Sequence, residues 1–213
     1  HESICDLVLE LVENAVSASA TRVDLDIAET PDRVRFSVQD DGVGMDHDAM
    51  ERLKDPYGTD GRKHPNRKVG LGFPFLAQAA ELVGGVVEVA SAPGAGTRID
   101  VDLPANHIDL PPTGDVVGLF QAVFCFPGDY ELVVRREKST TDGDVVDYTV
   151  SRGEIREALG ELDSVASRSA LREYLRSLEG PASSKPLPAT KGPEFPETPR
   201  APKAPEAERA PER

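Results

Sequence analysis

Apolar residues recur at helical spacing at the start of the chain and then alternate with polar residues. The helical set consists of Ile4, Leu7, Val8, Leu11, Val12 and Ala15. Their spacing of three and four residues predicts a helix that ends near Ser19, and Ser3 followed by Asp6 is typical of a helix start with a capping box. Alternation over 23–27 and again over 34–38 predicts two strands, each with one buried face.

Glycine-rich loops separate these strands from a second helix and a hairpin. The stretch 40–72 is rich in loop-forming residues, and only a short helix at 48–53 is predicted within it. A helical pattern follows at 74–83, and alternating runs at 86–90 and 98–103 predict two further strands. Hydrophobic residues make up 38% of the chain and aromatic residues only 5%, so we expect an α+β fold with an aliphatic core between a sheet and its covering helices.

The rest of the chain divides by composition into two parts that follow a first domain at 1–103. The segment 104–179 is predicted to be a small α+β extension, either a docking element for a partner or a cap on the core. Its predicted elements are a helix at 114–124, a hairpin of 130–136 with 145–150, and helices at 154–162 and 170–178. The segment 180–213 consists mainly of Pro, Ala, Glu and Lys, holds half of the 18 prolines, and is predicted to be a disordered tail.

The charge balance restricts the partners of the protein. The formal net charge is -14 and the isoelectric point is near 4.7, whereas binding to nucleic acid or to an anionic membrane normally needs a surplus of Lys and Arg. We therefore expect neither as a partner. The longest apolar run, 116–126, is well short of the roughly 20 residues that span a bilayer, so it predicts a core helix.

The cysteines and the first residues bear on the location of the protein. Cys5 and Cys125 are the only cysteines, and their wide separation favours two buried thiols in a reducing compartment over a disulfide or a metal site. The sequence opens at His1 without Met and without a signal sequence, which indicates a trimmed form and a cytoplasmic location.

The first candidate motif, Glu-Leu-Val-Glu-Asn-Ala, lies on the opening helix. Glu10 and Asn14 stand one helical turn apart and therefore project from the same face. An Asn oxygen can join a magnesium shell that phosphates and water otherwise supply, and a neighbouring carboxylate can orient or deprotonate an attacking water. Taken alone, the pair is also typical of a solvated helix face.

The second motif, Asp-Asp-Gly-Val-Gly-Met at 40–45, directly follows a predicted strand. Its two glycines permit a sharp turn and a close backbone approach to a flat ligand. A carboxylate at a strand end can accept a hydrogen bond from an exocyclic amine such as that of adenine. A hairpin or a calcium loop fits the acidic turn equally, although the alternating acids and the bidentate Glu of an EF-hand are missing.

The third motif, Gly-Leu-Gly-Phe at 70–73, precedes a predicted helix. It places free backbone N–H groups and the positive end of the helix dipole where a polyphosphate can bind. The one basic cluster of this acidic protein lies just upstream, at 62–68, and supplies charges that neutralise phosphates. A lone Gly-X-Gly is nevertheless most often structural.

The fourth motif, Gly-Ala-Gly-Thr at 94–97, is foremost a hairpin turn between two predicted strands, from which Thr97 can also reach a base through a water. In this order, the four motifs resemble the boxes of the GHKL ATPase superfamily, which contains gyrases, mismatch-repair ATPases and sensor histidine kinases. The resemblance covers residues 3–103, about half of the chain. It implies a two-layer α/β sandwich of the Bergerat type that binds ATP and Mg²⁺ beneath a mobile lid.

The resemblance also assigns roles to individual positions. It implies that Asn14 binds magnesium, that Glu10 is the catalytic base and that Asp40 binds adenine. The cofactor-binding positions that it implies are Asn14, Asp40, Gly42, Gly44, Met45, Thr59, Lys63, Lys68, Gly70, Leu71, Gly72 and Thr97. The lid is expected at 56–68, with its hinge near Thr59 and with its basic residues closing on the phosphates.

Parts of the chain are similar to different members of this superfamily. The opening helix and strand are similar to mismatch-repair ATPases, and the second glycine box with the following helix is similar to sensor kinases. The stretch 107–115 resembles short stand-alone ATP-binding proteins encoded near iron-hydrogenase genes. A sensor kinase carries an acceptor histidine on a helical hairpin before this domain, whereas we interpret His1 as a helix-edge residue or a remnant of truncation.

Three functions are compatible with the motifs. The first is an enzyme that transfers the terminal phosphoryl group of ATP to water or to a partner protein. The second is a binding module that ATP switches between two conformations. The third, a degenerate fold that serves only as an interaction platform, is disfavoured because the motif residues are intact. The same residues bind ATP in the first two cases, so the sequence does not decide between them.

Overall fold

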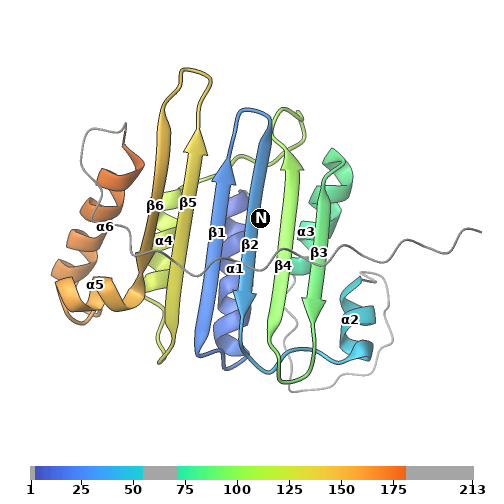
Figure 1. Cartoon of the computed structure of the whole chain (residues 1–213), viewed down its shortest axis with the longest axis horizontal. Coiled ribbons are helices and arrows are strands. Elements are labelled where there is room, and N and C mark those ends of the chain that lie inside the picture. Colours follow the sequence, from blue (N-terminus) through green and yellow to red (C-terminus); the bar gives the residue numbers. More distant parts are fainter. Residues whose placement is uncertain (1–2, 55–71, 181–213) are drawn as a thin grey trace, which may run out of the picture.

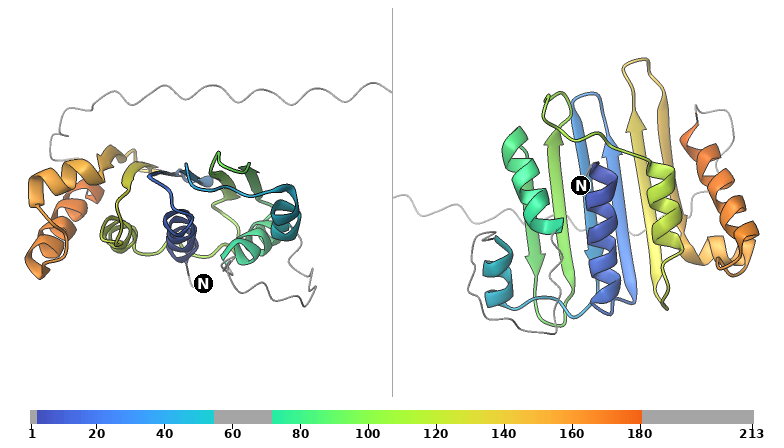
Figure 2. Two further views of the ribbon diagram at one scale, coloured as in Figure 1. Left: turned by 90° about the horizontal axis from the view of Figure 1, so that it is seen from below. Right: turned by 180° about the vertical axis from the view of Figure 1, so that it is seen from behind.

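The computed structural model describes residues 3–54 and 72–180 and shows a mixed sheet with helices packed on one of its faces (Figures 1 and 2). The helices are α1 (Ile4–Ser17), α2 (His47–Lys54), α3 (Gly72–Val83), α4 (Val116–Phe124), α5 (Arg152–Leu159) and α6 (Val165–Glu179). The strands are β1 (Arg22–Glu29), β2 (Arg33–Asp40), β3 (Val86–Ser91), β4 (Thr97–Pro104), β5 (Glu131–Ser139) and β6 (Val145–Ser151). This arrangement confirms the predicted α+β class and its two layers.

Within the described ranges the sheet has six strands in the order β3-β4-β2-β1-β5-β6. Neighbouring strands run antiparallel except β1 and β5, which run parallel along the whole of β1. A parallel pair needs a long crossover connection, and here the chain passes through β2, β3, β4 and α4 before β5 pairs with β1. The segment after residue 104 therefore extends the sheet of the first hundred residues.

The ends of the elements follow local capping and turn chemistry. The predicted capping box of α1 is present, since the Asp6 N–H donates to the Ser3 hydroxyl and the Asp6 carboxylate accepts the Ser3 N–H. The helix predicted at 170–178 begins five residues earlier, where the Ser164 hydroxyl caps it. Its first residue, Val165, is 82% exposed, so the first turn lacks the apolar face by which a helix is identified in sequence.

One hydrophobic core joins the first hundred residues to the extension. Helices α1, α3 and α4 cover the same face of the sheet, and α1 packs between the other two (Figure 2). Leu11 of α1, Val38 of β2, Phe120 of α4 and Leu132 of β5 are all buried in this core. Because one layer of side chains serves both parts of the chain, the extension contributes directly to the packing of α1.

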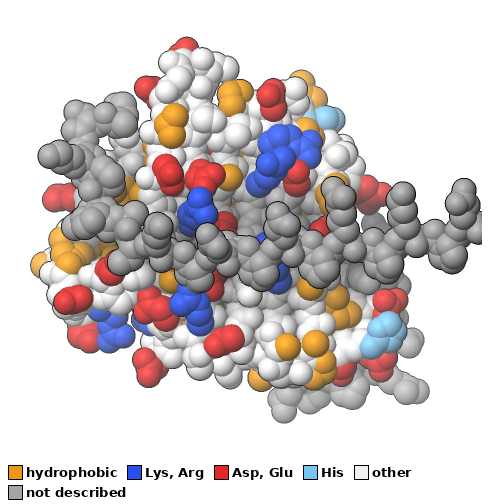
Figure 3. Space-filling view, viewed as in Figure 1, with side chains coloured by type: hydrophobic (Ala, Val, Ile, Leu, Met, Phe, Trp, Pro, Cys, Tyr) orange, Lys and Arg blue, Asp and Glu red, His pale blue; other side chains and the backbone are white. Residues whose placement is uncertain are grey.

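The other face of the sheet carries charged side chains in neighbouring pairs. Figure 3 shows acidic and basic groups interspersed over it. Arg33 and Arg35 both bond Asp102, at 2.7 and 3.1 Å, and Arg98 bonds Asp100 at 2.6 Å. These pairs are partly exposed, so each contributes little to stability, but together they give the face a solvated polar surface.

The two cysteines differ in burial. Cys5 is buried on α1, and desolvation by burial raises the pKa of its thiol to about 12. Cys125 is only partly buried, so the expectation that both thiols are buried is wrong for this residue, which caps the end of α4 where its apolar face stops. Both thiols are free. Of the helices that the structure describes, none has the length and apolar character needed to cross a bilayer.

A fully buried arginine ties the last helix to the sheet. The Arg136 guanidinium donates to Glu29 of β1 at 2.6 Å and to Glu179 at the end of α6 at 3.1 Å. It also donates to the Glu137 carbonyl, and the Tyr148 hydroxyl donates to Glu179 at 2.6 Å. The two carboxylates are mostly buried, so each charge in the cluster depends on the others for neutralisation.

We expect Arg136→Met to lower the free energy of unfolding by about 3–5 kcal/mol, because Glu29 and Glu179 are left buried without a cation. Chemical denaturation at neutral pH measures the change. The matched control is Arg135→Met, which removes an exposed partner of Glu137 and is expected to cost less than about 1 kcal/mol. Equal, small effects of the two substitutions would contradict a stabilising role for the buried cluster.

Candidate functional site

Three polar side chains form a row at one end of the sheet. In the strand register Ser91 of β3 pairs with Thr97 of β4, and Thr97 pairs with Asp40 of β2. Alternation along β2 and β4 places Asp40 on the face of the buried Val38 and Thr97 on the face of the buried Val101. The row therefore lies on the helix-covered side, where β2 ends and the chain enters the second motif.

The carboxylate of Asp40 is half-buried and partly engaged by the backbone. The Gly42 N–H donates to its Oδ1 at 2.8 Å, and the backbone of Thr97, the strand partner of Asp40, also lies close enough to favour the ionised form. Burial raises the pKa of Asp40 above its ordinary value of 3.8, against the lowering effect of these backbone groups. A carboxylate held in this way offers its remaining acceptor capacity in a fixed direction to a donor group of a ligand.

The adjacent Asp41 is exposed and is used by the fold itself. Its carboxylate accepts the Thr21 N–H at 2.7 Å, the Thr21 hydroxyl at 2.6 Å and the Arg22 N–H at 2.8 Å. The hydrogen bond from the Thr21 side chain and those from the backbone lower the pKa of Asp41. The structure thus separates the two neighbouring carboxylates, with Asp41 securing the start of β1 and Asp40 available on the helix-covered side.

Glycines allow the two turns at this end of the sheet to touch through their backbones. Gly44 has φ +64°, and a Cβ there would lie 2.0 Å from the Ala92 carbonyl oxygen. Gly96 has φ +77°, and a Cβ there would lie 1.9 Å from the Asp40 carbonyl oxygen. Gly44 was predicted to line a base, but the structure shows that the contact between the turns already requires a glycine at this position.

The end of α1 joins the same region. The Val43 N–H donates to the carbonyl of Ala18, which caps α1, and the Val43 carbonyl accepts the Gly94 N–H at 2.8 Å. Asn14 lies one turn before Ala18 and Glu10 one turn before Asn14, and both are partly buried. Two of the predicted motifs, the glycine turn and the β3–β4 turn, are therefore bonded to each other and to the helix that carries the first.

The structure describes only some of the remaining predicted positions. Met45 lies against the core and donates its backbone N–H to the Ser91 hydroxyl at 2.8 Å. Gly72 is the first residue of α3, a helix that packs beside α1. The other predicted positions lie outside the described residues, and they are Thr59, Lys63, Lys68, Gly70 and Leu71. The lid and most of the phosphate loop remain predictions.

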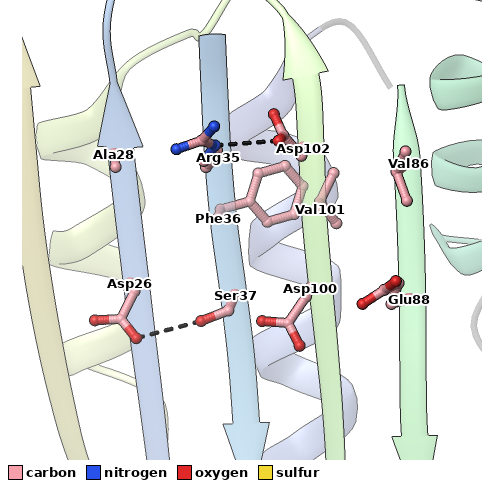
Figure 4. Close-up of a pocket in the computed structure, with 10 residues that line it drawn as sticks. All are labelled: Asp26, Ala28, Arg35, Phe36, Ser37, Val86, Glu88, Asp100, Val101 and Asp102. Carbon is pink, nitrogen blue, oxygen red and sulfur yellow. Dashed lines mark hydrogen bonds and ion pairs between the residues drawn. The ribbon is translucent and has the colours of Figure 1, made fainter. Parts of the chain in front are cut away.

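A concave region lies on the opposite face of the sheet and was not predicted. It is a depression of about 270 Å³ over β1, β2, β4 and β3 (Figure 4). The cross-strand partners Asp26, Ser37, Asp100 and Glu88 form a row across it. Burial raises the pKa of Asp26, although the Ser37 hydroxyl donates to it at 3.2 Å. Carboxylates repel phosphates, so this depression does not suit a nucleotide.

Comparison with known proteins agrees with the four motifs. Residues 1–107 match the family described as Histidine kinase-, DNA gyrase B-, and HSP90-like ATPase. The sensor histidine kinase YxdK of Bacillus subtilis is 32% identical over 95 residues, which are 42% of this chain and 29% of that protein. The histidine protein kinase DivJ of Caulobacter vibrioides is 36% identical over 107 residues, 49% of this chain and 18% of that protein.

The similarity is confined to a part of each relative. The matched stretch spans less than a third of the length of either kinase. Among solved structures, the Aquifex aeolicus MutL ATPase domain complexed with ADP is 15% identical with a TM-score of 0.37, and the match covers 82% of this chain and 70% of that one.

We expect Gly96→Ala to destabilise the protein more than Gly94→Ala, by roughly 1–3 kcal/mol. Both glycines have a positive φ, of 77° and 74°, so both substitutions carry a similar backbone cost of about 1–2 kcal/mol. A Cβ at Gly94 meets nothing within 4 Å, whereas one at Gly96 meets the Asp40 backbone. Thermal unfolding of the two variants without ligand measures the difference, and equal midpoints would contradict the close contact.

Proposed function

The chain belongs through residues 1–107 to the histidine kinase-, DNA gyrase B- and HSP90-like ATPases, and we propose that it binds Mg-ATP and transfers the terminal phosphoryl group. The observation that carries this proposal is that two of the motifs meet at one end of the sheet, where Asp40 and Thr97 pair beside the end of the helix that carries the first motif. The family match supports ATP binding. Magnesium, the reaction and its acceptor are proposed from the residues that follow.

The purine end of the site is proposed at Asp40. One carboxylate oxygen is held by the Gly42 N–H, which leaves the other to accept a proton of the adenine amine. Gly42 is itself buried against α1, and a Cβ there would lie 2.7 Å from the Ala18 carbonyl oxygen, so the turn runs close to the helix end. A directional acceptor of this kind in a partly desolvated position fixes the orientation of a base.

The phosphate end is proposed along α1 and the start of α3. Asn14 would contribute an amide oxygen to magnesium, a hard cation that accepts such ligands together with phosphates and water. Among the described residues, no group of three or more His, Cys, Asp or Glu side chains could hold a metal ion. Asn14 is the protein ligand that we propose. When bound, magnesium would supply charge neutralisation at the phosphates.

Glu10 is proposed as the base that orients or deprotonates the attacking group. It stands one turn from Asn14 on the partly buried side of α1, so a water or a side chain near a metal held at Asn14 would lie within its reach. The positive end of the α3 dipole begins at Gly72 and would favour the phosphates there. Lys63 and Lys68 are proposed to add positive charge when a nucleotide is bound.

A protein partner is proposed as the phosphoryl acceptor or as the factor that stimulates hydrolysis. The relatives at 32% and 36% identity are named as a sensor histidine kinase and a histidine protein kinase, and kinases of that description act on protein groups. This chain shares only a part of their length, so the identity of its own acceptor has to come from experiment.

Substitution of Asp40 by Asn should weaken ATP binding without destabilising the fold. The amide oxygen still accepts the Gly42 N–H, but the second carboxylate oxygen becomes a donor that opposes the adenine amine. We expect the affinity for ATP to fall by about 100-fold, as measured by calorimetry with ATP and magnesium. Unchanged affinity would refute the placement of the base.

The stability of the same variant follows from the pKa shift. The pKa of Asp40 is raised in the folded state, so stability falls as pH rises from 3.8 through that raised value, and the ionised group carries a cost at neutral pH. Asp40→Asn removes this cost and should leave the ligand-free protein at least as stable. The control is Asp41→Asn, which should lower the stability of the protein. The pKa of Asp41 is lowered in the folded state, so its ionised carboxylate stabilises the fold above pH 3.8. This stabilisation is lost as the pH falls through the lowered pKa.

Substitution of Glu10 by Ala should remove turnover and leave binding intact. We expect ATP affinity to change by less than about twofold, while phosphate release or transfer falls by about 100-fold or more. The matched control is Glu13→Ala, which removes an exposed carboxylate from the same helix and should retain activity. Both are measured with labelled ATP, with and without candidate partners, and full activity of the Glu10 variant would contradict its proposed role.

A further inference from the structure

The hydroxyl of Ser91 has every hydrogen-bonding position occupied. Its oxygen accepts the Met45 N–H at 2.8 Å, donates to the Gly96 carbonyl at 2.9 Å and lies 2.9 Å from the Thr97 hydroxyl. A serine hydroxyl has one proton and two acceptor lone pairs. Because the proton goes to Gly96 and one lone pair takes the Met45 N–H, the remaining lone pair receives the proton of Thr97.

This arrangement decides what Thr97 can offer to a ligand. Its hydroxyl proton is committed to Ser91, and its backbone is paired with that of Asp40 in the sheet. Oγ1 of Thr97 is therefore left as an acceptor only, next to a second group, Asp40, that is an acceptor when ionised. Two neighbouring acceptors suit a ligand amine and oppose a ligand carbonyl at the same place.

We propose that Ser91 is a positioning residue that selects 6-amino over 6-oxo purine nucleotides by holding the Thr97 hydroxyl as an acceptor. The inference rests on the proposed ATP site and deepens it. An adenine amine carries two protons, one for Asp40 and one for Thr97, directly or through a water. The 6-oxo group of inosine or guanine is itself an acceptor. It can form no hydrogen bond with the Asp40 carboxylate or with Oγ1 of Thr97, because none of these groups supplies a proton.

Ser91 also holds the site together at the backbone level. Its three bonds connect the end of β3, the glycine turn at Met45 and the first residue of β4. An alanine at this position leaves the Met45 N–H without its partner and frees the Thr97 proton to rotate toward the ligand. A rotating hydroxyl can donate to a 6-oxo group, so discrimination between the two purine classes should weaken.

Calorimetry with Mg-ATP and Mg-ITP tests this inference, since the two nucleotides differ at the position in question. We expect Ser91→Ala to weaken ATP binding by about two- to tenfold and to bind ITP no more weakly than the wild type. The ratio of the two affinities should thus fall by about the same factor. Ser91→Thr keeps the hydroxyl in a strand that accepts β-branched residues and should restore both the affinity and the ratio.

A second substitution keeps the test decisive if Ser91→Ala does not fold. Thr97→Val removes the proposed acceptor but keeps the bonds from Ser91 to Met45 and Gly96, and it should lower the same ratio. In the double variant the two effects should not add, because both act through one hydroxyl.

The possible outcomes separate this inference from the function on which it rests. A wild-type protein that binds no ATP overturns the proposed function and this inference with it. Wild-type binding of ATP with an unchanged ratio in Ser91→Ala overturns the inference alone. An equal loss of affinity for ATP and ITP also overturns it, because a purely structural role of Ser91 would weaken both nucleotides alike.

Discussion

The candidate site depends on a close backbone contact between the turn after β2 and the turn between β3 and β4. Gly44 and Gly96 permit it, since a Cβ at either position would overlap a carbonyl oxygen of the other turn. The contact brings the Ser91 hydroxyl to Met45 and Thr97, and it keeps β2 and β4 paired up to Asp40. The acceptors proposed to bind a base are thus aligned before any ligand arrives, which limits the cost of ordering them.

The segment after residue 104 supports this site from a distance. β5 pairs with β1 along its whole length, and α4 packs against α1, the helix that carries Glu10 and Asn14. Arg136 then joins β1 to the last residue of α6 through two mostly buried carboxylates. The position of α1 over the sheet is consequently set by both parts of the chain.

Local patterns in the sequence predicted most of the elements but not their long-range pairing. The capping box at Ser3 and the alternation in β1 to β4 determine helices and strands that form from nearby residues, and these are present. No local pattern indicates that β5 pairs with β1 in parallel, because that choice depends on a core assembled from residues more than a hundred positions apart. The start of α6 was missed because its first turn is exposed.

The residues of the candidate site were predictable where they belong to a recognisable sequence motif. Asp40 and Thr97 were singled out from their motifs, and the structure places them side by side. Ser91 was not, because a serine at the end of a strand has no distinctive spacing, and its importance comes from three contacts made across two turns. The carboxylates on the face of the sheet opposite the helices were missed for a similar reason, since Asp26 and Asp100 become neighbours of Ser37 only through strand register.

Residue-resolved amide NMR during a titration with Mg-ATP tests the placement of the nucleotide most directly. The account predicts that the largest changes occur at the amide of Gly42, which donates to the carboxylate proposed to bind the base, and at the amide of Thr97, the strand partner of Asp40. Changes confined to residues around Asp26 and Asp100 on the opposite face of the sheet would contradict it.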